Sequence, residues 1–273
     1  LMSQLSLLTL SKRHMATDFH FEVVVDSRSI RAGDSVLLEA HALVDAIEAE
    51  ITEYRGTSPV HRLNAAGVGE WIPMPNHFRQ LLKLALRLQK ESGDYFSPFA
   101  KVAGALDESC LEVEETRVRK RHEGVQIGFG AIGKGYALDQ VRALIERHGF
   151  ADYRLNCGGS SWILRGADAS GEPWEFAWAW DRDADGDYRG QSLALRRDEA
   201  LAVGVSGVLE QGNHFRFRGA PAPDGVLSGF SSGRSAAEAD ALSTALFVGA
   251  SIEGAGILTK LGNILRDPSL AYV

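Results

Sequence analysis

The sequence lacks several features that would define its class at once. It has only two cysteines in 273 residues, Cys110 and Cys157. They are too few for a disulfide framework and do not have the spacing of a metal site. Two cysteines allow a single bridge, but we expect two buried free thiols. No apolar run approaches the ~20 residues that a membrane-spanning helix needs. The formal net charge is −7, which leaves no basic stripe for phosphates and argues against a nucleic-acid partner.

The first residues also lack the order of a secretion signal. Residues 1–10 are mildly apolar, and the positive charges of Lys12 and Arg13 come after them. A signal peptide places its positive charge first and ends in a small-residue cleavage site. From this order we expect neither export nor a membrane anchor, and therefore a cytoplasmic location.

What the sequence does contain is typical of a globular protein, with 45% hydrophobic and 24% charged residues. Apolar periodicity and strand-forming runs predict an alternation of helices and many short strands. The predicted strands are 19–25, 125–127, 153–156, 162–165, 174–180, 192–195, 201–205 and 214–218. The predicted helices are 34–51 (beginning at Asp34 or Ser35), 77–91, 135–148, 236–249 and 252–261, and 117–123 is predicted to be a charged connector. This order indicates an α+β fold with mixed or antiparallel sheets and flanking helices, in a single domain over residues 1–273 with room for two intertwined lobes.

The glycine-rich segment 128–135 fits more than one template. Gly128, Gly130 and Gly133 satisfy G-x-G-x-x-G between a predicted strand and a helix, but the acid that a dinucleotide fold needs does not end the next strand. A phosphate-binding loop would need Ser or Thr after Lys134, where this chain has Gly135. A glycine turn without a ligand is the plain alternative. Exposed backbone N–H groups at a helix start, beside Lys134, would in any case suit an anionic group.

Further motifs stand before and after this segment, in a fixed order along the chain. They are Met15-Ala16-Thr17, 54–58, Arg62-Leu63-Asn64, 92–98, 128–139, 155–160, 205–207 and 239–246. In this order they resemble the motifs of the ApbE family of FAD:protein FMN transferases, over nearly the whole chain. The chain is identified as a divergent member of that family, and the resemblance implies a T-fold-related architecture.

The resemblance implies FAD and Mg²⁺ as cofactors and an acceptor flavoprotein as partner, with FMN transferred from FAD to a Thr or Ser of the acceptor. It assigns the metal to Asp240, Thr244 and the backbone carbonyl of Ala131. The flavin contacts that it assigns are Met15, Tyr54, Tyr95, Phe96, Ser97, Lys134, Gly158 and Gly159. The residues alone allow Asp240 and Thr244 as metal ligands, because side chains four apart share one helix face and oxygen ligands suit a hard cation. An isolated pair of this kind more often stabilises a helix start.

The sequence departs from the family pattern at several positions. Gly128, Ser97 and Ser160 stand where the family has acids, and Val205 replaces a Thr. The family signature His-x-Ile-Asp-Pro-x-Thr-Gly has no match between Gly207 and Ala239.

His214 and Asp224 are the candidates for part of the missing signature's catalytic role, although each also fits an ordinary strand-edge or turn residue. Two hypotheses follow. The chain is a Mg²⁺-dependent FMN transferase, or it is a non-catalytic relative that binds a flavin or nucleotide and acts through a protein partner.

Overall fold

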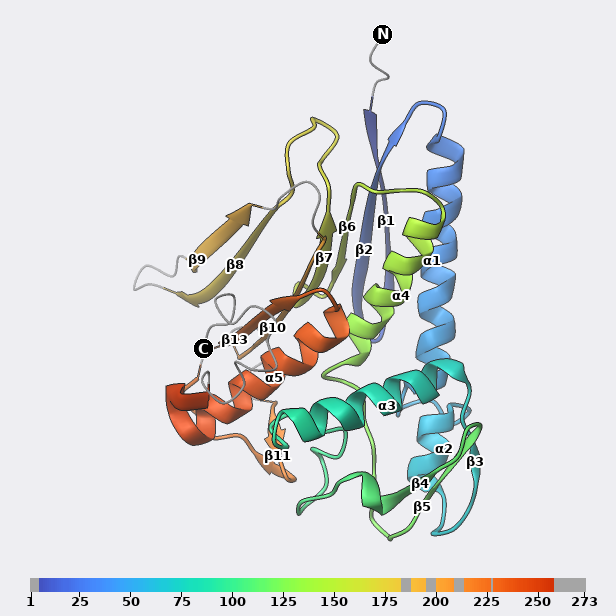
Figure 1. Cartoon of the computed structure of the whole chain (residues 1–273), viewed down its shortest axis with the longest axis vertical. Helices are drawn as coiled ribbons and strands as arrows, with labels where there is room; N and C mark the ends of the chain where they lie inside the picture. The colour runs from blue at the N-terminus through green and yellow to red at the C-terminus, as the bar shows by residue number, and fades with distance from the viewer. Residues whose placement is uncertain (1–4, 183–187, 195–199, 209–213, 227, 258–273) are drawn as a thin grey trace.

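A computed structural model describes residues 5–182, 188–194, 200–208, 214–226 and 228–257. Its centre is a six-stranded sheet in the order β1-β2-β6-β7-β10-β13 (Figure 1). Every neighbouring pair in this sheet is antiparallel. The strands are β1 (Leu5–His14), β2 (Thr17–Asp26), β6 (Tyr153–Cys157), β7 (Ser161–Arg165), β10 (Ala200–Gly207) and β13 (Ser228–Gly233).

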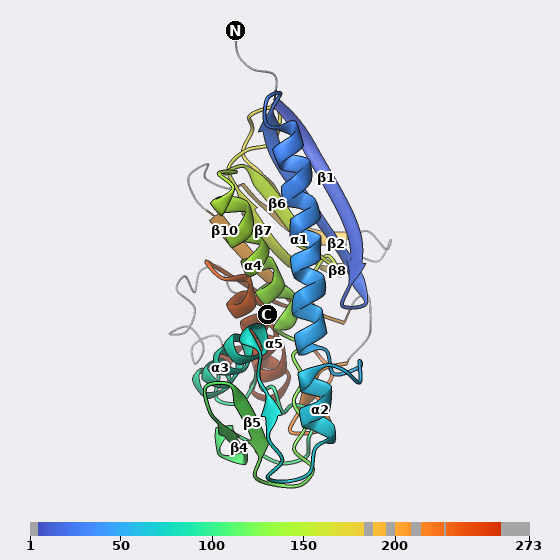
Figure 2. The ribbon, with the colours of Figure 1, turned by 90° about the vertical axis from the view of Figure 1, so that its right-hand side faces the viewer.

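Three helices cover one face of this sheet, as Figure 2 shows for α1 and α4. α1 (Ile30–Ile51) packs on β1 and β2, α4 (Gly133–Arg147) on β6 and β7, and α5 (Ala236–Glu253) on β10 and β13. Side chains alternate between the two faces of a strand. Tyr153, Leu155 and Cys157 of β6 accordingly lie fully buried in the core beneath the helices.

β8 (Glu175–Arg182) and β9 (Tyr188–Ala194) form a separate antiparallel hairpin, and a second core lies where the chain enters it. Trp174 precedes β8 and Phe176 lies within it, and both pack on apolar side chains of the sheet face opposite the three helices. The buried members of this second core are Val24, Leu164, Trp174, Phe176, Val203 and Phe230. This second core buries side chains of β10 and β13 such as Val203 and Phe230, whereas Leu5 and Leu7 of β1 are exposed.

The remaining elements lie beyond the end of α1. They are α2 (Pro59–Ala65), α3 (Asn76–Glu91) and a small sheet of β3 (Ile72–Pro73), β5 (Arg117–Lys120) and β4 (Leu111–Val113). Two 3₁₀ turns, η1 (Glu108–Cys110) and η2 (Gly254–Gly256), and the short hairpin of β11 (Arg216–Phe217) and β12 (Ala220–Pro221) complete the described chain. α3 packs against both α1 and α5 and so joins this part to the main sheet.

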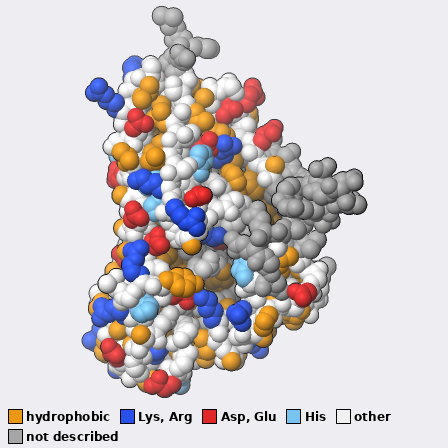
Figure 3. All heavy atoms as spheres, turned by 180° about the vertical axis from the view of Figure 1, so that it is seen from behind, with side chains coloured by type: hydrophobic (Ala, Val, Ile, Leu, Met, Phe, Trp, Pro, Cys, Tyr) orange, Lys and Arg blue, Asp and Glu red, His pale blue; other side chains and the backbone are white. Residues whose placement is uncertain are grey.

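The expected α+β class is confirmed, with five α-helices in the described part of the chain. Cys110 and Cys157 are free and buried, as expected. No helix within the described ranges is long and apolar enough to cross a membrane. On the face seen in Figure 3, acidic and basic side chains are interspersed over the described surface.

Several strand predictions are wrong, because the pairing between strands decides where these strands form. Residues 5–14, predicted as no element, form β1 and pair with β2 along their whole length. The predicted charged connector contains β5, in which Val118 and Lys120 are buried while the arginines face outward. The Lys120 ammonium donates to the Asn64 carbonyl at 3.0 Å, so the aliphatic stem is buried and the charge is satisfied.

Residues 125–127, predicted as a strand, form no strand. The side-chain amide of Asn64 replaces a partner strand there: it donates to the Ile127 carbonyl and accepts from the Ile127 N–H, both at 2.8 Å. The strand predicted at 214–218 is reduced to β11, which pairs only with β12. β13 and α2 were not predicted at all.

Two helix boundaries also differ from the prediction. α1 begins at Ile30, not at Asp34 or Ser35, because the Asp26 carboxylate accepts the N–H groups of Arg28 and Ser29 and turns the chain earlier. α5 runs to Glu253 without the break expected after Gly249. Residues 258–261 of the last predicted helix lie outside the described residues.

Candidate functional site

The glycine-rich segment 128–135 lies at the centre of the candidate site. The Gly128 N–H donates to the Pro98 carbonyl at 2.9 Å, next to the predicted contact residue Ser97. At the other end, the Gly135 N–H donates to Oδ2 of Asp240 on α5 at 2.7 Å. The segment therefore joins the 95–98 turn to the predicted metal residue.

Three glycines bring the backbone of α5 unusually close to its neighbours. A Cβ on Gly135 would lie 2.1 Å from the Ala236 carbonyl oxygen, one on Gly204 2.4 Å from the Ala239 carbonyl oxygen, and one on Gly229 2.5 Å from the Ser243 carbonyl oxygen. Only glycine allows such approaches. α5 is consequently fixed by main-chain contact against α4, β10 and β13.

Asp240 is a buried carboxylate where α5 meets the glycine segment. We call Asp240 and the neighbouring hydroxyl residues Ser161, Ser206, Ser243 and Thr244 the Asp240 corner. Oδ2 of Asp240 accepts from the Gly135 N–H and from the Ser161 hydroxyl at 2.9 Å. Burial raises the pKa of Asp240 to about 7, although the charge of Lys134 and these two hydrogen bonds act to lower it. Among the described residues, Oδ1 receives no hydrogen bond. A cation there would compensate the buried negative charge.

Hydroxyl groups of α5 lie one turn beyond Asp240, next to a hydroxyl group of β10. The Ser206 hydroxyl of β10 lies 3.0 Å from Oγ1 of Thr244 and 2.8 Å from Oγ of Ser243. A buried carboxylate with an open oxygen and a hydroxyl four residues later fit a hard divalent cation, which prefers oxygen ligands. Ala131, the third predicted metal residue, lies in the glycine segment two residues before α4.

Asp139 sets the start of α5 in this arrangement. Its carboxylate accepts from the Ala236 and Ala237 N–H groups, both at 3.0 Å, and from the Ser235 hydroxyl at 2.7 Å. It therefore satisfies N–H groups that a helix start leaves without partners. Sequence reasoning gave Asp139 no role, because its partners lie 97 and 98 residues further along the chain.

Lys134 and the predicted glycine contacts lie next to each other. The Lys134 ammonium donates to the Ser160 hydroxyl at 2.8 Å. Ser160 follows Gly158 and Gly159, whose φ angles of +59° and +70° form the left-handed turn between β6 and β7. This turn lies against the β1–β2 turn, because a Cβ on Gly158 would be 2.5 Å from Oγ1 of Thr17.

Met15 belongs to the β1–β2 turn. It adopts a φ of +47°, and its N–H donates to Oε2 of Glu48 at 3.0 Å. Met15, Gly158, Gly159 and Lys134 are therefore gathered at one end of the sheet, close to the Asp240 corner.

The aromatic candidates divide into exposed and buried ones. Tyr54 is 83% exposed beyond the end of α1, with the Lys101 ammonium 5.6 Å from its ring centroid. Tyr95 is half-buried and stacks on Phe217 at 5.7 Å. Phe96 is buried in the core, and the Ser97 hydroxyl accepts the Phe99 N–H at 3.0 Å. Tyr54 and Tyr95 are therefore the members of this group with ring surface available to a ligand.

His214 and Asp224 are both exposed. The His214 ring lies over Phe215 at 4.3 Å, and Phe215 packs on Phe247 of α5 at 4.2 Å. The Gly219 N–H donates to the Ala100 carbonyl at 2.9 Å and fixes this hairpin beside the 95–98 turn. The two catalytic candidates thus lie on the surface, whereas Asp240 is buried.

Sequence reasoning missed the hydroxyl groups that complete the corner. Ser161 and Ser206 contact Asp240 and Thr244, but they lie on strands 79 and 38 residues away in sequence. Ser161 follows the Gly158-Gly159 turn, and Ser206 belongs to the 205–207 motif. In the sequence, only the position of Ser161 and Ser206 next to these motifs could have indicated their role.

Solved structures of similar fold define the class of architecture. The flavin transferase ApbE from Vibrio cholerae is 19% identical, with a TM-score of 0.74 over 89% of this chain and 87% of that one. The apo form of the Pseudomonas stutzeri flavinyl transferase ApbE is 23% identical, with a TM-score of 0.76 over 90% and 85% of the two chains. At these identities the likeness shows the fold.

The family itself is shown by sequence. The model of the ApbE family matches residues 15–265, and the chain belongs to this family. Among curated relatives, the FAD:protein FMN transferase of Haemophilus influenzae is 22% identical over 200 residues, which are 62% of this chain and 58% of that protein. The match thus spans less than two thirds of that relative's length.

Proposed function

We propose that this protein is a Mg²⁺-dependent FAD:protein FMN transferase, which moves FMN from FAD to a Thr or Ser hydroxyl of an acceptor flavoprotein. The observation that carries the proposal is the Asp240 corner, with its buried carboxylate and the adjoining Thr244 hydroxyl. Family membership and the names of the relatives support the same activity.

The reaction exchanges one phosphorus–oxygen bond for another. The acceptor hydroxyl oxygen bonds to the phosphorus on the FMN side of the FAD pyrophosphate, the bond to the AMP oxygen breaks, AMP leaves, and the hydroxyl proton is released. Negative charge on the pyrophosphate opposes this attack, so positive groups aimed at it lower the barrier. Mg²⁺ held by Asp240, Thr244 and the Ala131 carbonyl would supply that charge.

The chain's own residues would bind and orient FAD around this corner. Lys134 lies at the start of α4, where its ammonium and the helix N–H groups suit a pyrophosphate. Its hydrogen bond to Ser160 holds the ammonium beside the Gly158-Gly159 turn. Tyr95 and Tyr54 offer ring faces for the flavin or adenine, and Met15 offers an apolar contact from the β1–β2 turn.

Transfer requires a group that accepts the proton of the acceptor hydroxyl, and this requirement favours a second candidate function. His214 and Asp224 are exposed and do not belong to a family signature motif. Either residue would accept this proton only when the acceptor lies against it. Without such a base, the protein would bind FAD through the same corner and act through a protein partner without transferring FMN.

One experiment separates the two functions. The purified chain is incubated with FAD, Mg²⁺ and an acceptor flavoprotein, and covalent FMN on the acceptor is measured by mass spectrometry together with FAD binding by fluorescence. The transferase predicts both FAD binding and covalent FMN, with transfer lost when EDTA removes Mg²⁺. Binding without transfer across several acceptors supports the non-catalytic function, and absence of FAD binding overturns both.

A further inference from the structure

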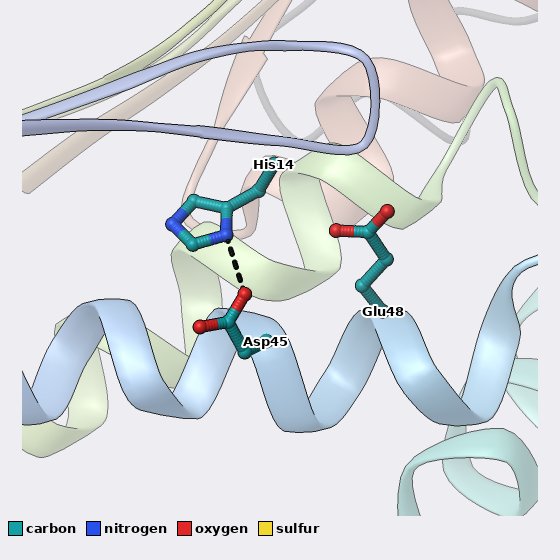
Figure 4. Close-up of side chains that lie close together, drawn as sticks. All are labelled: His14, Asp45 and Glu48. Atoms are coloured by element: carbon teal, nitrogen blue, oxygen red, sulfur yellow. Dashed lines mark hydrogen bonds and ion pairs between the residues drawn. The ribbon is translucent and has the colours of Figure 1, made fainter.

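A second group of ligand-type side chains lies outside the Asp240 corner. His14 ends β1, immediately before the turn that holds Met15, while Asp45 and Glu48 lie three apart on one face of α1 (Figure 4). One ligand atom of each residue lies within 4.8 Å of those of the other two. The His14 side chain is only 2% exposed, whereas that of Asp45 is 68% exposed.

A buried neighbour fixes which nitrogen of His14 carries a proton. His41 is fully buried, and its Nε2 lies 3.2 Å from the Leu10 carbonyl oxygen, which can only accept. Nε2 of His41 therefore donates, and because burial disfavours a charged ring, Nδ1 of His41 is an acceptor. Nε2 of His14 lies 2.9 Å from that Nδ1 and must donate to it.

The other nitrogen of His14 then faces a carboxylate. Nδ1 of His14 and Oδ1 of Asp45 are 2.9 Å apart. With the Nε2 proton already committed to His41, a neutral His14 would present a lone pair to the lone pairs of the carboxylate. The contact therefore needs a cation between the two atoms, which is either a second proton on His14 or a metal ion.

We propose that His14, Asp45 and Glu48 bind a first-row divalent transition-metal ion of the Zn²⁺ type. One imidazole and two carboxylates are a donor set that suits Zn²⁺, and an imidazole ligand disfavours Mg²⁺ and Ca²⁺. The two negative carboxylates and the neutral imidazole together balance the charge of a divalent ion. A metal-bound histidine characteristically donates its other N–H to a fixed acceptor, as His14 does to His41.

The local geometry leaves room for the ion. Zn²⁺ bond lengths of about 2.0–2.2 Å separate tetrahedral ligand atoms by about 3.3 Å, so Asp45 must move outward by a few tenths of an ångström. Its exposed side chain is free to do so and gives a path from solvent. The Met15 N–H holds Oε2 of Glu48 at 3.0 Å and orients that carboxylate, and a water completes four ligands.

The test uses the full chain without a histidine tag and without FAD. Zn²⁺ is titrated by calorimetry, and Co²⁺ is used as a substitute whose visible absorption reports nitrogen and oxygen coordination. We expect one Zn²⁺ per chain, unchanged by excess Mg²⁺. Asp45→Asn and Glu48→Gln should each weaken Zn²⁺ binding at least about tenfold and reduce the Co²⁺ band.

The matched control is Asp34→Asn, an exposed acid elsewhere on α1, which should bind Zn²⁺ like the wild type. Asp240→Asn should also keep the Zn²⁺ affinity, which separates this site from the Asp240 corner. Absence of Zn²⁺ binding, equal binding by wild type and both ligand variants, or displacement of Zn²⁺ by millimolar Mg²⁺ would overturn the proposal. In the first two cases a proton on His14 occupies the contact instead.

Discussion

The Asp240 corner and the segment that carries His214 and Asp224 both adjoin α5, but they are held in different ways. The corner is buried and is fixed by main-chain contacts at Gly135, Gly204 and Gly229. The segment rests on α5 through the Phe215 ring, and both of its candidate catalytic side chains face outward. Under the proposed function, the cation and FAD would bind at the buried corner, whereas the exposed segment would contribute little to transfer.

Under the proposed function, this difference concerns which residues would hold the cation and the anionic substrate. A buried carboxylate and its hydroxyl neighbours are positioned before any ligand arrives, which favours binding of a cation and an anionic substrate. The following predictions test this contrast, from the largest expected effect to the smallest.

Asp240→Asn should reduce FMN transfer by about 100-fold or more, since the neutral amide cannot hold a divalent cation against the pyrophosphate. Transfer to the acceptor is measured by mass spectrometry at fixed Mg²⁺. Asp34→Asn on the exposed face of α1 serves as the control and should keep the wild-type rate. An Asp240→Asn variant with an unchanged rate would show that the cation is held elsewhere.

Gly135→Ala should lower the free energy of unfolding by about 3 kcal/mol, because its methyl group would overlap the Ala236 carbonyl. Urea unfolding measures the effect. Gly130→Ala is the matched control in the same segment, where a Cβ meets nothing within 4 Å, and it should be nearly neutral. Equal stability of the two variants would contradict the close approach of α4 and α5.

Lys134→Ala should raise the Kd for FAD by about tenfold, the effect of losing one charge-assisted contact to the pyrophosphate. Flavin fluorescence measures the affinity, and Lys134→Arg should retain most of it. Ser160→Ala removes the hydrogen bond to the ammonium but leaves its charge, so its effect should be smaller. If Lys134→Ala binds FAD normally, the pyrophosphate lies away from the start of α4.

His214→Ala and Asp224→Ala should each change the transfer rate by only about twofold, which is the usual scale of surface substitutions. The same transfer assay applies, with Asp34→Asn as the reference for a neutral change. A loss of about 100-fold in either variant would assign catalysis to the exposed segment and remove the contrast with the Asp240 corner.

Local patterns in the sequence predicted α3, α4 and most of α5, because apolar residues at helical spacing indicate a buried face without knowledge of the partner. β13 carries no such signal: Ser228–Gly233 is rich in small residues and is a strand only because β10 pairs with it. β5 was not predicted for a similar reason, because the ammonium of its buried Lys120 donates to the carbonyl of the distant Asn64.

The sequence by itself determined the family, the α+β class and the placement of Asp240 and Thr244 four residues apart on one helix, because ordered motifs and helix spacing are local properties. Only the tertiary structure decided that Gly135 and Ser161 hydrogen-bond to Asp240, that Asp139 caps α5, and that His14 faces Asp45 and Glu48. These contacts join residues 31 to 105 positions apart. Burial and hydrogen-bond geometry, which arise only when the strands pair and the helices pack, selected them.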